Sequence, residues 1–215
     1  MKALVLAAHG SRRDPSANAL VRRLAEAVRA RRIFDEVAAA FHQGEPGFDQ
    51  VLDELRSDEV TVVPVMTAAG HYSEVVLPEA LARNRRYADV RLRVTPPVGG
   101  HSAIAALVAR RVTELLGEHG LPRSGTSILL VGHGTGRHPA SRTTTLDLAE
   151  TLRRRRGAGE VVTGFLDDEP SVAEGFAAAS LGAVLVLPFL IGGGGHALED
   201  IPVALGVAPG EAPLA

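Results

Sequence analysis

Residues 4–11 read Leu-Val-Leu-Ala-Ala-His-Gly-Ser, and residues 128–135 read Ile-Leu-Leu-Val-Gly-His-Gly-Thr. Each stretch is a short apolar run that ends in His-Gly, which is typical of a buried parallel strand followed by a tight turn. The displacement that places His9 on His133 also aligns residues well beyond these stretches. The aligned pairs include Arg13 with Arg137, Pro15 with Pro139, Phe41 with Phe165, Glu45 with Glu169 and Pro64 with Pro188. The chain therefore contains one ancestral unit twice, which is too few copies for a solenoid.

Strands and helices are predicted to alternate within each unit. In the first unit we expect strands at Lys2–Ala8, Val37–Phe41, Val60–Met66 and Val90–Val94, and helices at Ser16–Arg32, Phe48–Arg56, Ser73–Arg85 and Ala103–Leu116. In the second unit we expect strands at Ile128–Val131, Val161–Phe165 and Val184–Leu190, and helices near Ser141–Arg156, Ser171–Ala179 and Leu198–Leu205. This alternation predicts an α/β protein with two doubly wound parallel-sheet lobes related by internal duplication.

The domain boundaries follow from the repeat and from a run of Gly, Pro and Ser between its copies. We predict a first lobe at residues 1–117, a linker at 118–125 and a shortened second lobe at 126–215. The tail at residues 208–215 is rich in Pro, Gly and Ala and supplies neither a fourth strand nor a closing helix. Either that strand is dispensable or another chain covers the edge, so monomer and homodimer both stay open.

Composition excludes several classes of function. The 215 residues carry a net charge of −2, which leaves no basic surface for nucleic acid or for anionic lipid. The chain has no cysteine, so disulfide frameworks, thiolate metal sites and cysteine nucleophiles are excluded. The N-terminal apolar run is too short for a signal peptide, and the longest apolar stretch, Ala183–Ile191, is too short to span a bilayer. We therefore expect a cytoplasmic protein with no membrane partner.

Polar residues of the same type follow corresponding strands in both units. His9, Glu45 and His71 come after the first three strands, and His133, Glu169 and His196 do so in the second unit. Parallel strands end at one edge of their sheet, where open α/β folds place their ligand sites. Neutral imidazole is a good ligand for Co, Ni, Fe and Zn, and His and Glu can exchange protons near neutral pH. Each unit therefore offers a candidate metal and acid–base site.

The remaining candidate groups are less distinctive. Four other histidines have no histidine at the equivalent repeat position and are interpreted as ordinary surface or loop residues: His42, His101, His119 and His138. Arg12 and Arg13 follow the first His-Gly turn and suit carboxylate groups on a ligand, although a solvated loop is the alternative. Gly192–Gly195 lacks the Gly-Lys-Ser/Thr of a nucleotide-binding loop.

Taken together, the motifs resemble those of a known family. The pattern is His-Gly-Ser-Arg at residues 9–12, Glu-Pro at 45–46, and Gly-His followed by a helix with Pro. Its most specific stretch is Pro-Phe-Leu-Ile-Gly-Gly-Gly-Gly-His-Ala-Leu-Glu-Asp-Ile-Pro at residues 188–202. These motifs, spread from Leu4 to about Leu205, are similar to those of the class II tetrapyrrole chelatases, specifically the CbiX-type sirohydrochlorin cobaltochelatases and the related ferrochelatases.

The resemblance implies a two-lobed chelatase-like fold and ATP-independent insertion of a divalent metal substrate, Co²⁺, Fe²⁺ or Ni²⁺, into sirohydrochlorin, with no tightly bound cofactor. It implies that His9 and His71 bind the metal and help to remove pyrrole protons, and that Glu45 assists as an acid–base or metal-guiding group. Arg12 and Arg13 would face substrate carboxylates. The equivalents His133, Glu169 and His196 are intact, and we favour the first half because its unit is complete.

Two other functions are compatible with the sequence. A non-catalytic metal- or tetrapyrrole-binding protein could keep the fold and the ligands without inserting metal. A flavodoxin-like nucleotide or phosphate binder would use the strand-to-helix turns, whose backbone N–H groups suit anions. Metal binding without insertion would favour the first alternative, and affinity for phosphoryl ligands that ignores His9→Ala would favour the second.

Overall fold

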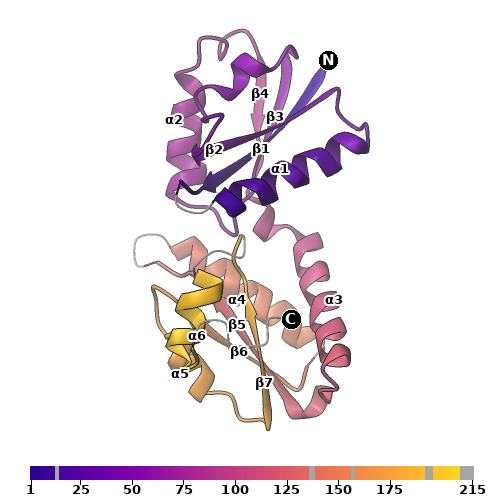
Figure 1. Ribbon diagram of the computed structural model, residues 1–215, viewed down its shortest axis with the longest axis vertical. Helices are drawn as coiled ribbons and strands as arrows, with labels where there is room; N and C mark the ends of the chain where they lie inside the picture. The colour runs from indigo at the N-terminus through magenta and orange to yellow at the C-terminus, as the bar shows by residue number, and fades with distance from the viewer. Residues whose placement is uncertain (13–14, 136–138, 156–157, 192–195, 209–215) are drawn as a thin grey trace. The chain divides into compact units, whose positions relative to one another are not determined.

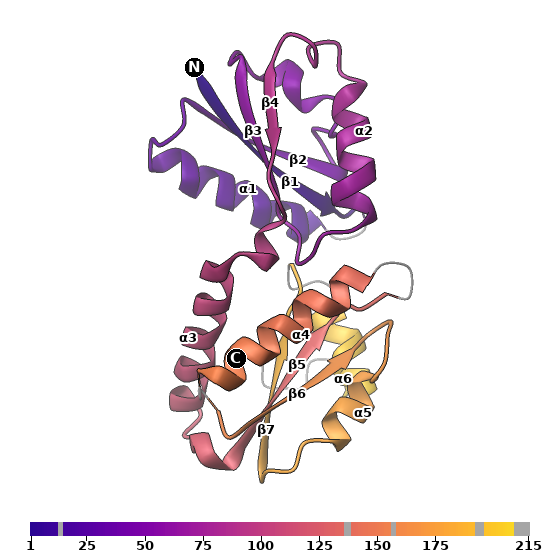
Figure 2. The same cartoon turned by 180° about the vertical axis from the view of Figure 1, so that it is seen from behind.

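The computed structural model describes residues 1–12, 15–135, 139–155, 158–191 and 196–208. The chain divides into two compact units, Met1–Gly99 and Gly100–Ala215. Figures 1 and 2 show a parallel sheet flanked by helices in each unit. No helix among the described residues is long and apolar enough to cross a membrane. The predicted fold class is confirmed.

The first unit contains a four-stranded parallel sheet in the order β2-β1-β3-β4. Its strands are β1 (Lys2–Gly10), β2 (Glu36–Gln43), β3 (Glu59–Pro64) and β4 (Arg91–Val94). Its helical segments are α1 (Pro15–Ala30), the 3₁₀ turn η1 (Val51–Glu54), the π-helical turn η2 (Tyr72–Val76), α2 (Leu77–Ala82) and the 3₁₀ turn η3 (Val98–Gly100). All four strands lie where the sequence predicts them.

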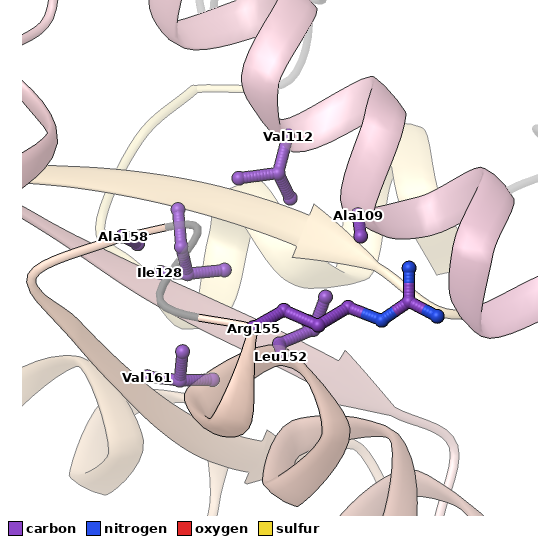
Figure 3. Close-up of a pocket in the computed structure, with 7 residues that line it drawn as sticks. All are labelled: Ala109, Val112, Ile128, Leu152, Arg155, Ala158 and Val161. Carbon is purple, nitrogen blue, oxygen red and sulfur yellow. The ribbon is translucent and has the colours of Figure 1, made fainter.

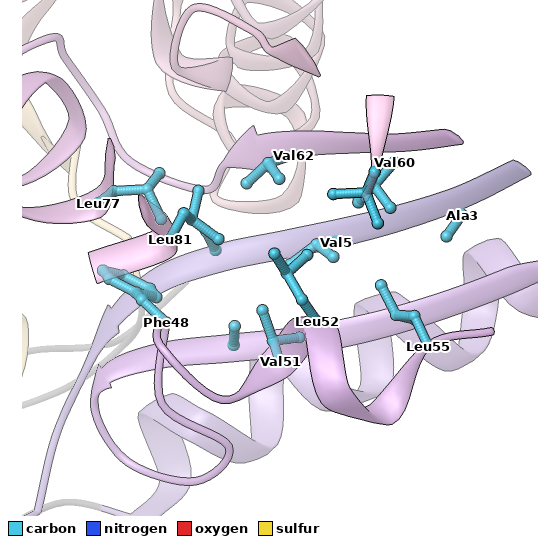
Figure 4. Close-up of a cluster of buried hydrophobic side chains, with 13 residues drawn as sticks. Ala3, Val5, Phe48, Val51, Leu52, Leu55, Val60, Val62, Leu77 and Leu81 are labelled. Atoms are coloured by element: carbon cyan, nitrogen blue, oxygen red, sulfur yellow. The ribbon is translucent and has the colours of Figure 1, made fainter. Parts of the chain in front are cut away.

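Alternating residues of β1 divide the core of the first unit into two layers. Ala3, Val5 and Ala7 point to the face that η1 and α2 cover, which Figure 4 shows with Phe48, Leu52, Leu77 and Leu81 packed against it. The other face, with Leu4, Leu6 and Ala8, packs against Val21 and Ala25 of α1. Helices thus cover both faces, as a doubly wound sheet requires.

The second unit contains a three-stranded parallel sheet in the order β6-β5-β7. Its strands are β5 (Thr126–Gly132), β6 (Glu160–Phe165) and β7 (Ala183–Pro188). Its helical segments are α3 (Ser102–Glu118), η4 (Arg123–Gly125), α4 (Pro139–Arg154), α5 (Val172–Ala177), η5 (His196–Asp200) and α6 (Ile201–Ala204). Within the described residues, this sheet has no fourth strand.

The boundary between the units differs from the predicted linker at residues 118–125. The predicted boundary places helix α3 in the first lobe, but its buried residues Val112 and Leu116 pack with Ile128 of β5 and Leu152 of α4. The helix therefore belongs to the second unit.

A void of about 10 Å³ remains beside this contact, lined by apolar groups, and Figure 3 shows the guanidinium of Arg155 extending away from it. A volume of this size is at the lower limit for one water molecule.

The predicted helix at Phe48–Arg56 is wrong in length and type. The helical spacing of its buried residues is real, because Phe48, Leu52 and Leu55 enter one core cluster. Only the 3₁₀ turn η1 forms, and Leu55 is already extended. The reason lies in the next residues, since the backbone N–H groups of Arg56 and Ser57 donate to the Glu36 carboxylate instead of to helix carbonyls.

Both units place a π-helical turn before a proline-containing helix. In the first unit η2 leads into α2, with Pro78 in its first turn. In the second unit η5 leads into α6, with Pro202 in its first turn. Because proline lacks an N–H, it cannot complete the regular α-helical hydrogen bond to the residue four positions earlier. In both units, a π-helical turn followed by a proline-containing helix therefore sets the backbone conformation directly after His71 and His196.

A buried serine is tied to a strand-opening glutamate in each unit. The Ser57 hydroxyl and the backbone N–H groups of Arg56 and Ser57 hold the pKa of Glu36 below its usual range. In the second unit the Ser127 hydroxyl, followed by the N–H and hydroxyl of Ser180, lowers the pKa of Glu160. Each carboxylate thus anchors the segment that leads into the third strand of its sheet.

Replacing both Glu36 and Glu160 with glutamine is expected to lower the free energy of unfolding at pH 7 by about 1 kcal/mol per site. Because both folded-state pKa values are lowered, the stabilisation is present above the unfolded value of about 4.3 and is lost as the pH falls through the folded values. Urea unfolding at pH 7 and at pH 3 should therefore show the variant approaching the wild type on acidification. Glu26→Gln, on the exposed surface of α1, is the control. A constant difference across pH would contradict the prediction.

Candidate active site

His9 and His42 lie side by side at the carboxyl edge of the first sheet. The register of β1 and β2 pairs Ala8 with Phe41 and Gly10 with Gln43, so His9 falls opposite His42. Side chains at one register position of neighbouring parallel strands point to the same face. The centres of the two imidazole rings are 5.4 Å apart, with 55° between the ring planes. The fold thus brings together two histidines that are distant in sequence.

Tyr72 joins these two rings to His71. Its ring meets His9 edge-on, with centroids 4.5 Å apart and planes at 90°, and lies 5.1 Å from His42. The His71 ring is 5.7 Å from Tyr72. Ser73 is buried and fixes this segment through hydrogen bonds with the N–H and C=O of Gly70. The predicted pair His9 and His71 therefore belongs to one ring cluster, consisting of His9, His42, His71 and Tyr72.

The tautomer of His9 follows from its hydrogen bond. Nδ1 of His9 lies 2.9 Å from the carbonyl oxygen of Gly10. A carbonyl can only accept, so in this bond Nδ1 carries the proton and the neutral ring keeps the lone pair of Nε2. Metal-binding histidines usually have one nitrogen tied to a backbone carbonyl or carboxylate in this manner. The partly buried His9 is thus arranged to offer Nε2 to a metal ion or a proton.

The turn after β1 has little room for a side chain. Gly10 has φ +68°, and a Cβ there would come within 2.8 Å of Asn18 Oδ1 and of the Gln43 carbonyl oxygen. Asn18 closes the turn by accepting from the Ser11 N–H at 2.9 Å and donating to the Ser11 carbonyl at 3.1 Å. A phosphate-binding turn would offer the Ser11 N–H to its ligand. Here that donor already has a partner, which disfavours a phosphate binder.

His42 is exposed, in line with its interpretation as a surface histidine, but its ring lies beside two other rings of the site. Its side chain is open to solvent on one side, but the rest of the ring contacts His9 and Tyr72, and Phe48 lies 6.2 Å away. Partial burial, then the positive charges that His9, Arg12 and His71 carry when protonated, lower the pKa of His42. The second unit has no histidine at the position equivalent to His42, so this residue is a point at which the two units differ.

Glu45 lies in the turn that follows β2 and is exposed. Its peptide bond to Pro46 is cis, and its carbonyl accepts a hydrogen bond from Arg22, whose guanidinium stacks on Phe41. No group of three or more His, Asp or Glu side chains within the described residues is placed to hold one metal ion. The structure therefore brings His9 and His71 into one cluster but does not join the Glu45 carboxylate to them.

Of the two arginines predicted to bind substrate carboxylates, the structure describes Arg12. Arg12 is exposed and close enough to influence His42 electrostatically. Arg13 lies outside the described residues, as do His138 and Gly192–Gly195. His101 has a structural role, since its side chain accepts from the Ala103 N–H at the start of α3.

Among the described residues, the second unit repeats the backbone of the site. His133 Nδ1 lies 2.9 Å from the Gly134 carbonyl, as in the first unit, and 3.4 Å from Asp167. Glu169 is exposed and precedes a cis proline, and its carbonyl accepts from Arg142, which stacks on Phe165. His196 begins η5, but its side chain lies outside the described part of the chain.

The positions of His42 and Tyr72 are aliphatic in the second unit. Leu166 follows Phe165 as His42 follows Phe41, and Ala197 follows His196 as Tyr72 follows His71. Neither His42 nor Tyr72 is among the site residues that the sequence predicts. Comparing the two copies for the polar and aromatic residues that they do not share would have found them.

Comparisons with known proteins identify the family of the chain and proteins of similar fold. The family model CbiX matches residues 3–115 and 127–213. A "Probable sirohydrochlorin cobaltochelatase" of Halobacterium salinarum is 29% identical over 94% of this chain and 76% of its own. A solved structure of CbiX, described as the terminal enzyme for siroheme biosynthesis in denitrifying bacteria, is 26% identical, with a TM-score of 0.72 over 99% of this chain and 93% of that one.

A larger protein also contains this fold. DR2241 from Deinococcus radiodurans, described as a multi-domain protein with structural similarity to chelatases, is 29% identical with a TM-score of 0.82. The alignment covers 96% of this chain and 48% of the Deinococcus chain, so the present chain spans about half the length of that protein.

Proposed function

Because the chain belongs to the CbiX family, we propose that it inserts a divalent metal ion into sirohydrochlorin without ATP, with Co²⁺ as the favoured metal and Fe²⁺ as the second candidate. The name of the Halobacterium relative supports the tetrapyrrole substrate and cobalt, while the siroheme enzyme of denitrifying bacteria supports the iron reaction. Imidazole accepts Co, Fe and Ni, so the ligand type does not select among them.

The ring cluster is the observation that carries this proposal. Metal insertion requires a site that delivers a partly desolvated ion and that accepts the two pyrrole N–H protons. His9, with Nδ1 bound to Gly10 and Nε2 open, supplies a ligand and a base at the edge of the sheet. His71, held next to Tyr72, supplies a second imidazole for the same tasks.

The first unit is proposed as the active half. Both units tie the Nδ1 of one histidine to the following glycine carbonyl. Only the first adds the imidazole of His42 and the ring of Tyr72, where the second has Leu166 and Ala197. In the second unit the Nδ1 of His133 also lies 3.4 Å from the Asp167 carboxylate, a neighbour that His9 does not have in the first unit.

The remaining residues have supporting roles in the proposal. The exposed carboxylate of Glu45 assists as an acid–base or metal-guiding group, because it lies in the turn that follows the strand of His42. Arg12 and Arg13 bind substrate carboxylates through their planar guanidinium groups.

The proposal is tested by following the absorbance of sirohydrochlorin with Co²⁺, and separately with Fe²⁺ without oxygen, in the absence of ATP. The protein is expected to accelerate insertion above the spontaneous rate, and the ratio of the two accelerations ranks the metals. Bovine serum albumin at the same concentration controls for non-specific binding of the macrocycle. If no metal is inserted faster than spontaneously while Co²⁺ or sirohydrochlorin still binds, the non-catalytic binding protein becomes the better description.

A further inference from the structure

The distance between His9 and His42 matches that of two imidazoles on one metal ion. With a metal–nitrogen bond of about 2.1 Å and a nitrogen about 1.1 Å from its ring centre, two such rings have centres about 4.5–5.5 Å apart at coordination angles of about 90–120°. The observed separation is 5.4 Å. The two strands therefore already hold the ring centres at the separation that a shared ion requires.

The backbone holds this pair in place. His9 and His42 sit at facing positions of β1 and β2, next to the paired residues Ala8 and Phe41. Phe41 is fully buried, and its N–H donates to the Pro46 carbonyl beyond the turn. His9 is oriented by the Gly10 carbonyl and by the edge of the Tyr72 ring. A pair on two hydrogen-bonded strands is more precisely placed than one on two loops.

The duplication supplies an internal comparison. The second unit keeps the strand, the His-Gly turn and the buried phenylalanine, but Leu166 takes the position of His42. Leu166 packs against a core cluster of that unit. The two units therefore share this backbone but differ in the side chain that it carries, which is an imidazole in the first unit and an aliphatic group in the second. The unit that has the imidazole is also the one that has the Tyr72 ring.

We propose that His42 is a metal ligand, binding the incoming ion together with His9, and that Tyr72 is the positioning residue that holds the two rings. This inference rests on the proposed function for the role of His9 and adds His42 to it. Even with the imidazole of His71 from the proposed function, the protein supplies three ligands at most and leaves the other coordination positions to water and to the substrate nitrogens. Such an incomplete shell suits an ion that must be passed on, because a closed four-ligand site would retain it.

The test measures the binding of Co²⁺ alone, by titration calorimetry and by the visible absorption of the bound ion, in the full chain. His42→Leu, which introduces the residue of the second unit, is expected to weaken Co²⁺ binding at least about tenfold. His9→Ala should weaken it similarly. His119→Ala, which removes an exposed imidazole at the end of α3, should leave the affinity unchanged. Thermal unfolding confirms that each variant is folded.

Tyr72 is tested in the same assay. Tyr72→Phe keeps the ring and should retain the wild-type affinity, whereas Tyr72→Ala should lose part of it. Wild-type affinity in His42→Leu together with loss in His9→Ala would overturn the role of His42 and leave the proposed function intact. Failure of the wild type to accelerate insertion would instead count against the proposed function, while a Co²⁺ affinity that depends on His42 would still support the ligand assignment.

Discussion

His9→Ala is expected to lower the acceleration of metal insertion by about 100-fold or more, while His133→Ala leaves it within about twofold. The expected loss is large because His9 is proposed both to bind the ion and to accept a pyrrole proton, and a positioned base alone contributes about 10²–10⁴-fold. His133 has the same bond to the following glycine, but Leu166 and Ala197 take the positions that His42 and Tyr72 have in the first unit. Initial rates with sirohydrochlorin and Co²⁺ measure both effects.

The two variants are matched controls for each other, since each removes one partly buried imidazole from the same turn of a repeated unit. Loss only in His133→Ala would move the active site to the second half. Equal loss in both would show that the two halves act together. Comparing the urea unfolding of both variants separates these outcomes from a loss of folded protein.

Leu77→Ala is expected to lower the free energy of unfolding by about 2–5 kcal/mol. Leu77 has no exposed surface and packs at the start of α2 against the core that Figure 4 shows. Truncating a leucine in such a place removes buried apolar surface and leaves a cavity. Because α2 continues directly from η2, which contains Tyr72, the variant should also insert metal more slowly at temperatures where it is still folded.

Val75→Ala is the matched control for this prediction. Val75 lies two residues earlier in the same helical segment, but 40% of it is exposed. Its truncation should change the free energy of unfolding by no more than about 0.5 kcal/mol. Chemical denaturation of both variants provides the comparison, and similar losses in the two would show that this segment contributes little to the core.

The central strands β1 and β5 were predictable because each is an apolar run, buried on both faces, that ends at a glycine. The helix at residues 48–56 was not, although its apolar spacing is helical. Its length depends on the bonds from Arg56 and Ser57 to Glu36, which a local pattern does not contain. The placement of α3 was missed for a similar reason, since the apolar stripe of Val112 and Leu116 shows that it must be buried but not against which sheet.

The candidate site was predictable only where the two units agree. His9 and His71 share their residue type with His133 and His196, so the repeat points to them. His42 and Tyr72 are unique to the first unit, and their significance lies in ring contacts across two strands and a helical turn. Strand register supplies the missing information, because it alone places residue 42 opposite residue 9.

The last strand of each sheet along the chain, which lies at one of the sheet's two edges, has a consequence for how the chain behaves while it folds. In the first unit this strand is β4, whose exposed Arg91 and Arg93 discourage pairing with a strand of another molecule. In the second unit, among the described residues, it is β7, which has no charged residue and reads Ala-Val-Leu-Val-Leu-Pro. An uncharged, β-prone edge is a template for intermolecular strand pairing until the rest of the unit has assembled. Intermolecular aggregation during refolding should therefore begin in the second half of the chain and increase with protein concentration.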